Sequence, residues 1–466
     1  MPQETLSGFA ASAAERSGVP GVAAAVCVDG REVYACHGVT SIENPLPVDR
    51  DTIFVVGSVT KTFTATAMMR LVAEGKVDLD APVRRYVPEF TLKDERAAAA
   101  ITVLNLLNHT AGLDWRMNAE TGEGDDALAL YVARMAESEP IAPPGARASY
   151  SQVGYNLAGR VIEKVTGLTF ERAVASLIFE PLGLSHTFFA IADVMTRRFA
   201  VGHNVGQDGA LSVARQWKDT RANNPGGDAG SSVADLLRWA RFHLGDGRAE
   251  TGEQVLPAAV LRQMQQQTAE LRGSSLGDAL GIGWFLRDIG GVRTVGHDGS
   301  ANGQFASLLT VPERDFAVVV LSNAGPDSGL AVNQAVIRWA LEHHLGVADR
   351  DAQPLPHDAA RAAEIAGIYE NDMMRVTFRT DGTGLTAEFA IKPEIRAATR
   401  TELPPDMPPA DLGLLPGGTD EYIITSGGLK GQRGFFTRDH DGQITAADMA
   451  GRKFTRTRPS TDDACG

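Results

Sequence analysis

A serine and a lysine one helical turn apart are the first residues of the chain whose types could do chemistry together. Ser58 and Lys61 lie in Phe54-Val-Val-Gly-Ser-Val-Thr-Lys, where Gly57 breaks an apolar run and Ser58 opens a helical pattern. Residues three apart on a helix share a face, with Cβ atoms roughly 5–6 Å apart. An amine at that distance can take the serine proton and activate the oxygen as a nucleophile. By itself the tetrapeptide more often marks a helix-capping serine beside a solvated lysine.

A tyrosine stands at a second junction between a loop and a helix. Tyr150, in Tyr-Ser-Gln, follows the loop at residues 143–145 and precedes a helical pattern. A phenol at such a junction can be exposed to a cleft. Taken alone, Tyr150 is more simply a core or surface tyrosine.

The segment His297-Asp-Gly-Ser ends a predicted strand that starts at Val292. Gly299 would let a substrate approach the strand edge, and the N–H of Ser300 could donate to an oxyanion together with the N–H of Ser58. By itself this segment is more simply the transition from a strand to a turn.

A rival serine motif occurs at Gly273-Ser-Ser-Leu-Gly277, which matches the nucleophile elbow of the α/β-hydrolases. That elbow needs a strand before the serine and a helix after it. Here residues 263–271 have a polar helical pattern, as the end of a helix expected over residues 256–271, and the residues from Asp278 lead into a strand. The context is inverted, so Ser58 remains the better candidate.

Metal and nucleotide sites are not indicated. The three cysteines lack metal-ligand spacing, and His343 and His344 lie at the end of a predicted helix, where imidazole complements the helix dipole. No glycine-rich phosphate motif opens a helix. The net charge of -14 argues against partners such as nucleic acid or an anionic membrane surface.

The amino terminus, the lack of a long apolar run and the cysteine content predict a cytoplasmic protein. No apolar run is long enough to span a membrane, and the amino terminus lacks the cationic and apolar segments of a secretory signal as it stands. Three sparse cysteines suit a reducing compartment.

The elements that must position these residues indicate an α+β fold. A helix at residues 4–18 and a hairpin at residues 22–38 open the chain, and strands run from Gly281 to Asn323 before a helix at residues 330–344. Helices fill the region between, so one sheet must form from both ends of the segment. We expect residues 1–346 to be one domain, residues 347–358 a linker, and residues 359–466 a small antiparallel barrel, because their short alternating segments are separated by Asp-Gly and Gly-Gly turns.

Taken in order, the three motifs resemble those of the penicillin-binding-protein and class C β-lactamase superfamily of serine enzymes. Leu106-Leu-Asn-His-Thr-Ala-Gly-Leu and Ser231-Ser-Val-Ala-Asp-Leu-Leu-Arg-Trp also look like family segments, and the resemblance covers residues 5–345. It implies a β-lactamase/transpeptidase-like fold with an antiparallel sheet and a helical lobe, a lipocalin-like C-terminal barrel, and no metal or organic cofactor. The implied catalytic residues are Ser58, Lys61, Tyr150 and His297, and the implied substrate-binding residues are Gln152, Gly299 and Ser300.

Two positions depart from the family pattern. His297 stands where a lysine commonly supplies permanent positive charge, and an ordinary histidine with a pKa of about 6.5 is mostly neutral at pH 7. This His-x-Gly form resembles D-aminopeptidases, family esterases and thioesterase-like peptide cyclases. Gln152 stands where asparagine is usual and offers the same amide one methylene further out. His109 matches a family position whose implied role is structural.

The resemblance implies a serine hydrolase that forms an acyl-enzyme from amide or ester bonds of small substrates, with D-amino-acid-containing peptides or amides favoured. A carboxylesterase, a thioesterase or acyltransferase that cyclises peptides, and a non-catalytic penicillin-binding or sensor protein are the alternatives. Either Lys61 or Tyr150 could be the base. The expected partner is a small-molecule or peptide substrate, and the oligomeric state stays open.

Overall fold

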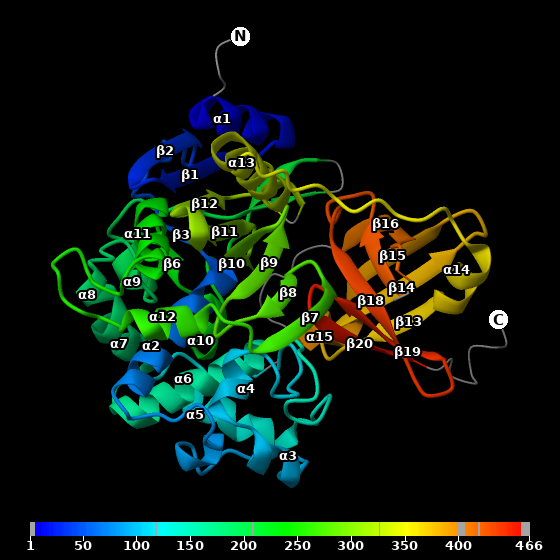
Figure 1. Cartoon of the computed structure of the whole chain (residues 1–466), viewed down its shortest axis with the longest axis horizontal. Helices are drawn as coiled ribbons and strands as arrows, with labels where there is room; N and C mark the ends of the chain where they lie inside the picture. Colours follow the sequence, from blue (N-terminus) through cyan, green and yellow to red (C-terminus); the bar gives the residue numbers. More distant parts are fainter. Residues whose placement is uncertain are drawn as a thin grey trace.

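An eight-stranded antiparallel sheet forms the centre of the larger part of the molecule (Figure 1). The computed structural model describes residues 5–117, 119–206, 209–325, 327–398, 406–417 and 420–457. The strand order is β2-β1-β12-β11-β10-β9-β8-β7, so the sheet is built from both ends of the segment, as predicted. Its strands are β1 (Gly21–Val28), β2 (Arg31–Gly38), β7 (Ala269–Ser274), β8 (Gly277–Leu280), β9 (Phe285–Ile289), β10 (Val292–Ala301), β11 (Gln304–Val311) and β12 (Phe316–Ser322).

Helices cover both faces of this sheet. Helices α1 (Leu6–Ser17) and α13 (Asp327–Leu345) pack on one face, and α11 (Val233–Leu244) packs on the other. The apolar side chains of β1 alternate between the two layers: Val22 and Val26 pack with α1 and α13, whereas Ala23 and Ala25 join the core of the helical lobe. A strand buried on both faces explains why β1 is an uninterrupted run of small apolar residues.

The helical lobe lies on the far side of the sheet from α1 and surrounds a buried helix, α2 (Thr60–Ala73) (Figure 1). Two short strands, β3 (Phe54–Val55) and β6 (Gly230–Ser231), pair just before α2 begins. A separate strand pair is β4 (His203–Val205) with β5 (Leu211–Val213). The other helices of this region are α3 (Glu95–Ala100), α4 (Val103–Leu107), α5 (Ala127–Arg134), α6 (Gln152–Thr166), α7 (Phe170–Val174), α8 (Glu180–Leu182), α9 (Ile191–Val194), α10 (Asn224–Gly227) and α12 (Ala258–Met264).

A closed eight-stranded antiparallel barrel forms the C-terminal part, drawn in orange and red in Figure 1. Closure by pairing of the first and last strands leaves no exposed sheet edge. Tyr369, Phe378, Tyr422 and Phe436 fill its interior. Its elements are α14 (Ala359–Ile365), β13 (Gly367–Glu370), β14 (Met374–Thr380), β15 (Leu385–Ile391), α15 (Pro393–Ala398), β16 (Met407–Leu414), β17 (Glu421–Ile424), β18 (Arg433–Arg438), β19 (Ile444–Met449) and β20 (Arg452–Arg456).

The helix expected over residues 256–271 is wrong at its C-terminal end. Helix α12 ends at Met264, whose carbonyl accepts a hydrogen bond from the N–H of Ile282. The chain then turns, and β7 pairs with β8 from Ala269 onward. Strands therefore begin earlier than the expected Gly281, and long-range pairing overrides the helical preference of the glutamine-rich stretch.

No helix among the residues that the structure describes is long and apolar enough to cross a membrane.

Candidate active site

Ser58 and Lys61 meet at the N-terminus of α2, as the one-turn spacing predicts. Ser58 lies in a 3-10 turn at Gly57–Val59, and the Lys61 Nζ donates to the Ser58 Oγ over 3.3 Å. The same amine donates to Gln152 Oε1 over 2.7 Å and to the carbonyl of Gly226. Three acceptors therefore hold a fully buried lysine head group against the serine oxygen.

The pairing of β3 with β6 fixes the turn that presents Ser58. The N–H of Val56 donates to Ala229 O over 2.9 Å, and the N–H of Ala229 donates to the Thr60 hydroxyl over 3.1 Å. That hydroxyl donates in turn to Gly57 O over 2.6 Å. The segment after α10 thus clamps the residues on either side of the serine.

The charge of Lys61 is destabilised by its surroundings. Burial lowers the pKa of Lys61 well below 10.5, and the positive charges of Arg452 and Arg116 lower it further. Asp228 acts in the opposite direction and raises this pKa. An amine that gives up its proton readily beside a serine hydroxyl can serve as a general base.

Tyr150 lies beside this pair. Its ring is 4.8 Å from the Lys61 Nζ and packs against His109 with ring centroids 4.5 Å apart. Burial raises the pKa of Tyr150 to about 12, against a smaller lowering by the neighbouring Ser58 hydroxyl. The Tyr150 hydroxyl itself makes no hydrogen bond of ordinary geometry with a described residue. Tyr150 is thus a neutral phenol at pH 7.

His297 is buried next to Tyr150 and carries no charge. Its Nδ1 lies 2.6 Å from Asp298 O, and its ring centroid is 4.5 Å from that of Phe285 and 6.2 Å from that of Tyr150. Burial and the positive charge of Lys61 lower the pKa of His297 to about 3. The permanent positive charge that a lysine would supply is therefore absent at this position.

Two glycines bring the end of β10 against the turn of Ser58. A Cβ atom at Gly299 would lie 2.0 Å from Val56 O and 2.8 Å from Ser58 N. A Cβ atom at Gly57, whose φ is +51°, would lie 2.4 Å from Ser300 N. Only glycine fits at either position, and the backbone nitrogens of Ser58 and Ser300 are neighbours as a result.

Gln152 and His109 are both engaged within the protein. Besides accepting from Lys61, the Gln152 amide donates to Asn223 O over 3.3 Å. The His109 Nδ1 accepts from the N–H of Ser151 over 3.1 Å, directly before α6. His109 therefore supports the loop that carries Tyr150.

A cavity of about 130 Å³ opens at Ser58. Its walls come from the turn before α2, the loop at Trp115, the segment around α10, the end of β10 and the barrel. The lining residues are Ser58, Trp115, Arg116, Gln152, Asp219, Asn223, Gly227, Asp228, Ser300, Ala301, Asn302 and Arg452.

Arg452 enters this cavity from the first position of β20 in the barrel. Its guanidinium carbon lies 4.6 Å from the centroid of the Trp115 ring and 4.8 Å from that of the Tyr150 ring. Its only hydrogen bond within the described residues goes to Ala450 O over 3.2 Å, and its Nε has no partner there. The N–H of Tyr150 donates to Gly451 O over 2.6 Å, which ties this corner of the barrel to the candidate site.

Sequence reasoning missed Arg452, Trp115, Arg116 and Asp228. Arg452 lies almost 400 residues beyond Ser58, and no motif marks it. Asp228 lies in a turn-rich stretch, Asn223-Asn-Pro-Gly-Gly-Asp, and its position there gave no sign of a nearby lysine.

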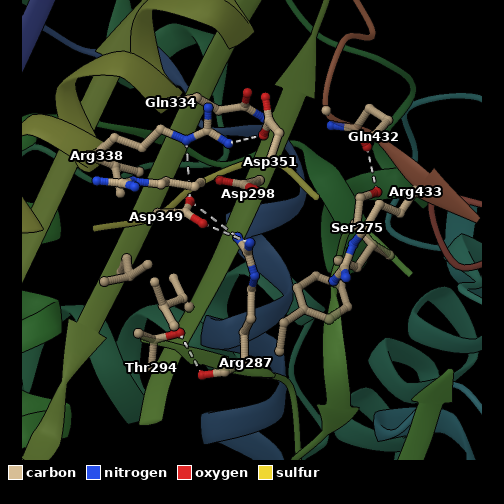
Figure 2. Close-up of a pocket in the computed structure, with 18 of the residues that line it drawn as sticks. Ser275, Arg287, Thr294, Asp298, Gln334, Arg338, Asp349, Asp351, Gln432 and Arg433 are labelled. Atoms are coloured by element: carbon tan, nitrogen blue, oxygen red, sulfur yellow. Dashed lines mark hydrogen bonds and ion pairs between the residues drawn. The ribbon is translucent and has the colours of Figure 1, made fainter. Parts of the chain in front are cut away.

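A second cavity, of about 210 Å³, lies between β10, α13 and the barrel segment at residues 431–433 (Figure 2). Its charges are paired: Arg287 binds Asp349 over 2.9 Å, and Arg338 binds both Asp349 and Asp351. Ser275 of the rival motif lines it and donates to Gln432 Oε1 over 2.5 Å. Ser275 sits between two strands, β7 and β8, so the strand-turn-helix context of a nucleophile elbow is missing.

No group of three or more His, Cys, Asp or Glu side chains among the described residues could hold a metal ion.

Comparison with known proteins places the chain in a family. The family profile described as Beta-lactamase matches residues 6–341. Penicillin-binding protein 4 of Amycolatopsis lactamdurans is 35% identical over 364 residues, which cover 76% of this chain and 94% of that protein. The crystal structure of SurE matches with a TM-score of 0.74 at 26% identity and covers 97% of this chain and 98% of its own, and the structure of SurE with D-Leu matches with a TM-score of 0.72 at the same identity and coverage. The chain therefore belongs to the Beta-lactamase family and is a serine hydrolase.

Proposed function

We propose that the protein forms an acyl-enzyme on Ser58 from the amide or ester bonds of small substrates that contain a D-amino acid. The observation that carries this proposal is that Lys61 and Tyr150 both lie beside Ser58, which lines a cavity. The likeness to SurE with D-Leu over 97% of this chain supports a D-amino-acid substrate.

Lys61 is the better base for the first step. Its amine contacts the Ser58 oxygen and has a depressed pKa, whereas the pKa of Tyr150 is raised to about 12. The Ser58 oxygen attacks the carbonyl carbon as its proton moves to Lys61, and the leaving group takes a proton back as its bond to carbon breaks. The Tyr150 ring lies 4.8 Å from the Lys61 Nζ and its hydroxyl neighbours Ser58, so Tyr150 can relay that proton.

The backbone N–H groups of Ser58 and Ser300 form the oxyanion hole of this mechanism. They are brought together by the close contact of Gly57 with the end of β10. A single such donor typically stabilises the transition state by about 3–4 kcal/mol.

In this proposal the two domains have different roles. Residues 1–346 form the catalytic domain, residues 347–358 the linker and residues 359–466 the barrel domain. The barrel contributes Arg452, a positive charge that lines the Ser58 cavity, whereas the neutral His297 lines the second cavity.

Covalent labelling tests the nucleophile. Wild-type protein and the variant Ser58→Ala are treated with a fluorophosphonate probe, and the labelled residue is identified by mass spectrometry. We expect no labelling of Ser58→Ala and normal labelling of Ser275→Ala, which removes the serine of the rival motif. Persistent labelling of Ser58→Ala would move the nucleophile elsewhere.

Hydrolysis rates on matched substrates test the acyl group. We expect turnover of D-alanine p-nitroanilide to exceed that of the L-isomer. A high rate on p-nitrophenyl acetate with none on either anilide would replace the peptidase assignment by an esterase.

A further inference from the structure

A buried carboxylate lines the Ser58 cavity without a counter-ion. Asp228 is 4% exposed and follows α10, the segment whose Gly226 carbonyl holds Lys61. Its Oδ2 has no hydrogen-bond partner, and its Oδ1 accepts only a long contact of 3.5 Å from the N–H of Asp219. It forms no ion pair with any described residue. A buried carboxylate in this state is costly unless a partner arrives.

The neighbouring cations are already engaged with other groups. Lys61 donates to three acceptors, and Arg116 forms an ion pair with Asp219. Lys218 donates to Phe189 O over 3.0 Å and to Asn224 Oδ1 over 2.5 Å. These three cations act on the charge of Asp228 from a distance, and none lies within ion-pairing reach of it. The missing partner must therefore come from the cavity side.

We propose that Asp228 binds the primary ammonium group of a substrate. This inference rests on the acyl-transfer function proposed above and names its substrate class, an amine. An ammonium has three N–H donors and a positive charge. It therefore supplies a hydrogen-bond donor for the Asp228 Oδ2 atom and a counter-ion for the buried carboxylate. Arg452, the unpaired cation of the same cavity, would repel such a group toward Asp228.

The ammonium can belong to either of two reactants. It can be the free amino group of the residue that acylates Ser58. It can also be a separate acceptor: its ammonium gives one proton to Asp228, the resulting amine attacks the acyl-enzyme carbonyl, a C–N bond forms and the bond from carbon to the Ser58 oxygen breaks. The second proton of the amine then returns to that oxygen.

The first experiment tests the acylating residue. The ratio of kcat/KM for D-alanine p-nitroanilide to that for N-acetyl-D-alanine p-nitroanilide is measured at pH 7 in wild type and in Asp228→Asn. We expect this ratio to fall about 10- to 100-fold in Asp228→Asn, the usual effect of removing one charge-assisted contact. The matched control is Asp219→Asn, which removes a carboxylate that already has a partner in the same cavity and should change both substrates equally.

The second experiment tests the acceptor. An N-acetyl-D-alanyl thioester acylates the enzyme in the presence of D-alaninamide, and mass spectrometry gives the ratio of aminolysis to hydrolysis. A fall of this ratio in Asp228→Asn places the acceptor amine at Asp228. Two unchanged ratios in an Asp228→Asn protein that still labels at Ser58 would overturn the inference and leave the acyl-enzyme intact. Failure of wild type to label at Ser58 would instead overturn the proposed function.

A measurement on wild type covers the case in which Asp228→Asn does not fold. D-Alaninamide should slow fluorophosphonate labelling of Ser58 at concentrations at least about tenfold lower than N-acetyl-D-alaninamide, which lacks the ammonium. Equal protection by the two amides would overturn the inference.

Discussion

Strand β10 forms a wall of two cavities whose charged side chains are in opposite states. In the cavity of Figure 2, Arg287, Arg338, Asp349 and Asp351 neutralise one another through short ion pairs. In the smaller cavity at Ser58, Arg452 and Asp228 have no ion-pair partner among the described residues. Satisfied charges hold segments together, whereas unsatisfied charges beside a nucleophile are available to a ligand. The state of the charges, and not the volume, distinguishes the two cavities.

The largest expected difference in activity is between a substitution beside Ser58 and a substitution in the cavity of Figure 2. Lys61→Ala removes the group in contact with the Ser58 oxygen, so kcat/KM should fall about 10,000-fold or more. Asp349→Asn breaks two ion pairs of the other cavity and should leave kcat/KM unchanged, while the free energy of unfolding falls by about 1–2 kcal/mol. Steady-state kinetics and urea denaturation measure the two effects. A large loss of activity in Asp349→Asn would erase the distinction between the cavities.

Two arginines of the barrel offer the next comparison. Arg452→Ala should lower kcat/KM about 10- to 100-fold for substrates with a free carboxylate near the reacting bond, because it removes a charge-assisted contact. The amides of the same substrates should lose much less. Arg433→Ala, at the other cavity, is the control and should affect neither group. Equal losses of kcat/KM on the acids and on their amides would show that Arg452 acts by packing against the Trp115 and Tyr150 rings and not by binding a carboxylate.

The pH profile of Ser58 labelling should shift in opposite directions when Asp228 and Arg452, the two unpaired charges, are replaced. Labelling of Ser58 should accelerate as Lys61 loses its proton, at a pH well below 10.5. Asp228 stabilises protonated Lys61, so Asp228→Asn should lower the pKa of Lys61. The acid limb of the profile, where the labelling rate rises with pH, then shifts to lower pH. Arg452 destabilises the protonated lysine, so Arg452→Ala raises this pKa and shifts the limb to higher pH. Asp351→Asn, in the other cavity, should leave the limb in place, and shifts of one sign in both variants would contradict this account.

The smallest effect should come from Gln152→Asn. The shorter side chain withdraws the amide oxygen from the Lys61 amine but keeps the same chemical group. We expect kcat to fall by about tenfold or less, the worth of one hydrogen bond. A loss as large as that of Lys61→Ala would show that Gln152 takes part directly in the chemistry.

The sequence carried enough information for the local parts of the site. Ser58 and Lys61 meet because they are one helical turn apart, and Gly299 is explained by the strand end on which it lies. The sheet followed from strand patterns at both ends of the segment, and the barrel followed from short alternating segments between turns. Local propensity failed at residues 269–271, where pairing with β8 outweighs a helical composition.

Local sequence patterns could not predict the roles of Arg452 and Asp228. Arg452 comes near Tyr150 only because the barrel docks with its β19–β20 corner against the catalytic part. Asp228 is identified by a missing partner, and the absence of a partner is a property of the folded neighbourhood. Neither property has a local signature in the chain.

The hydrogen bond between the N–H of Tyr150 and Gly451 O has a consequence for how this enzyme can diversify. Both atoms belong to the backbone, so a change of the side chain at position 452 leaves the bond available. The barrel corner therefore keeps its place while the neighbouring side chain at position 452 is free to change. Substitution at that single position can alter the charge and size of the Ser58 cavity without rebuilding the catalytic centre, which makes the barrel a replaceable selectivity module.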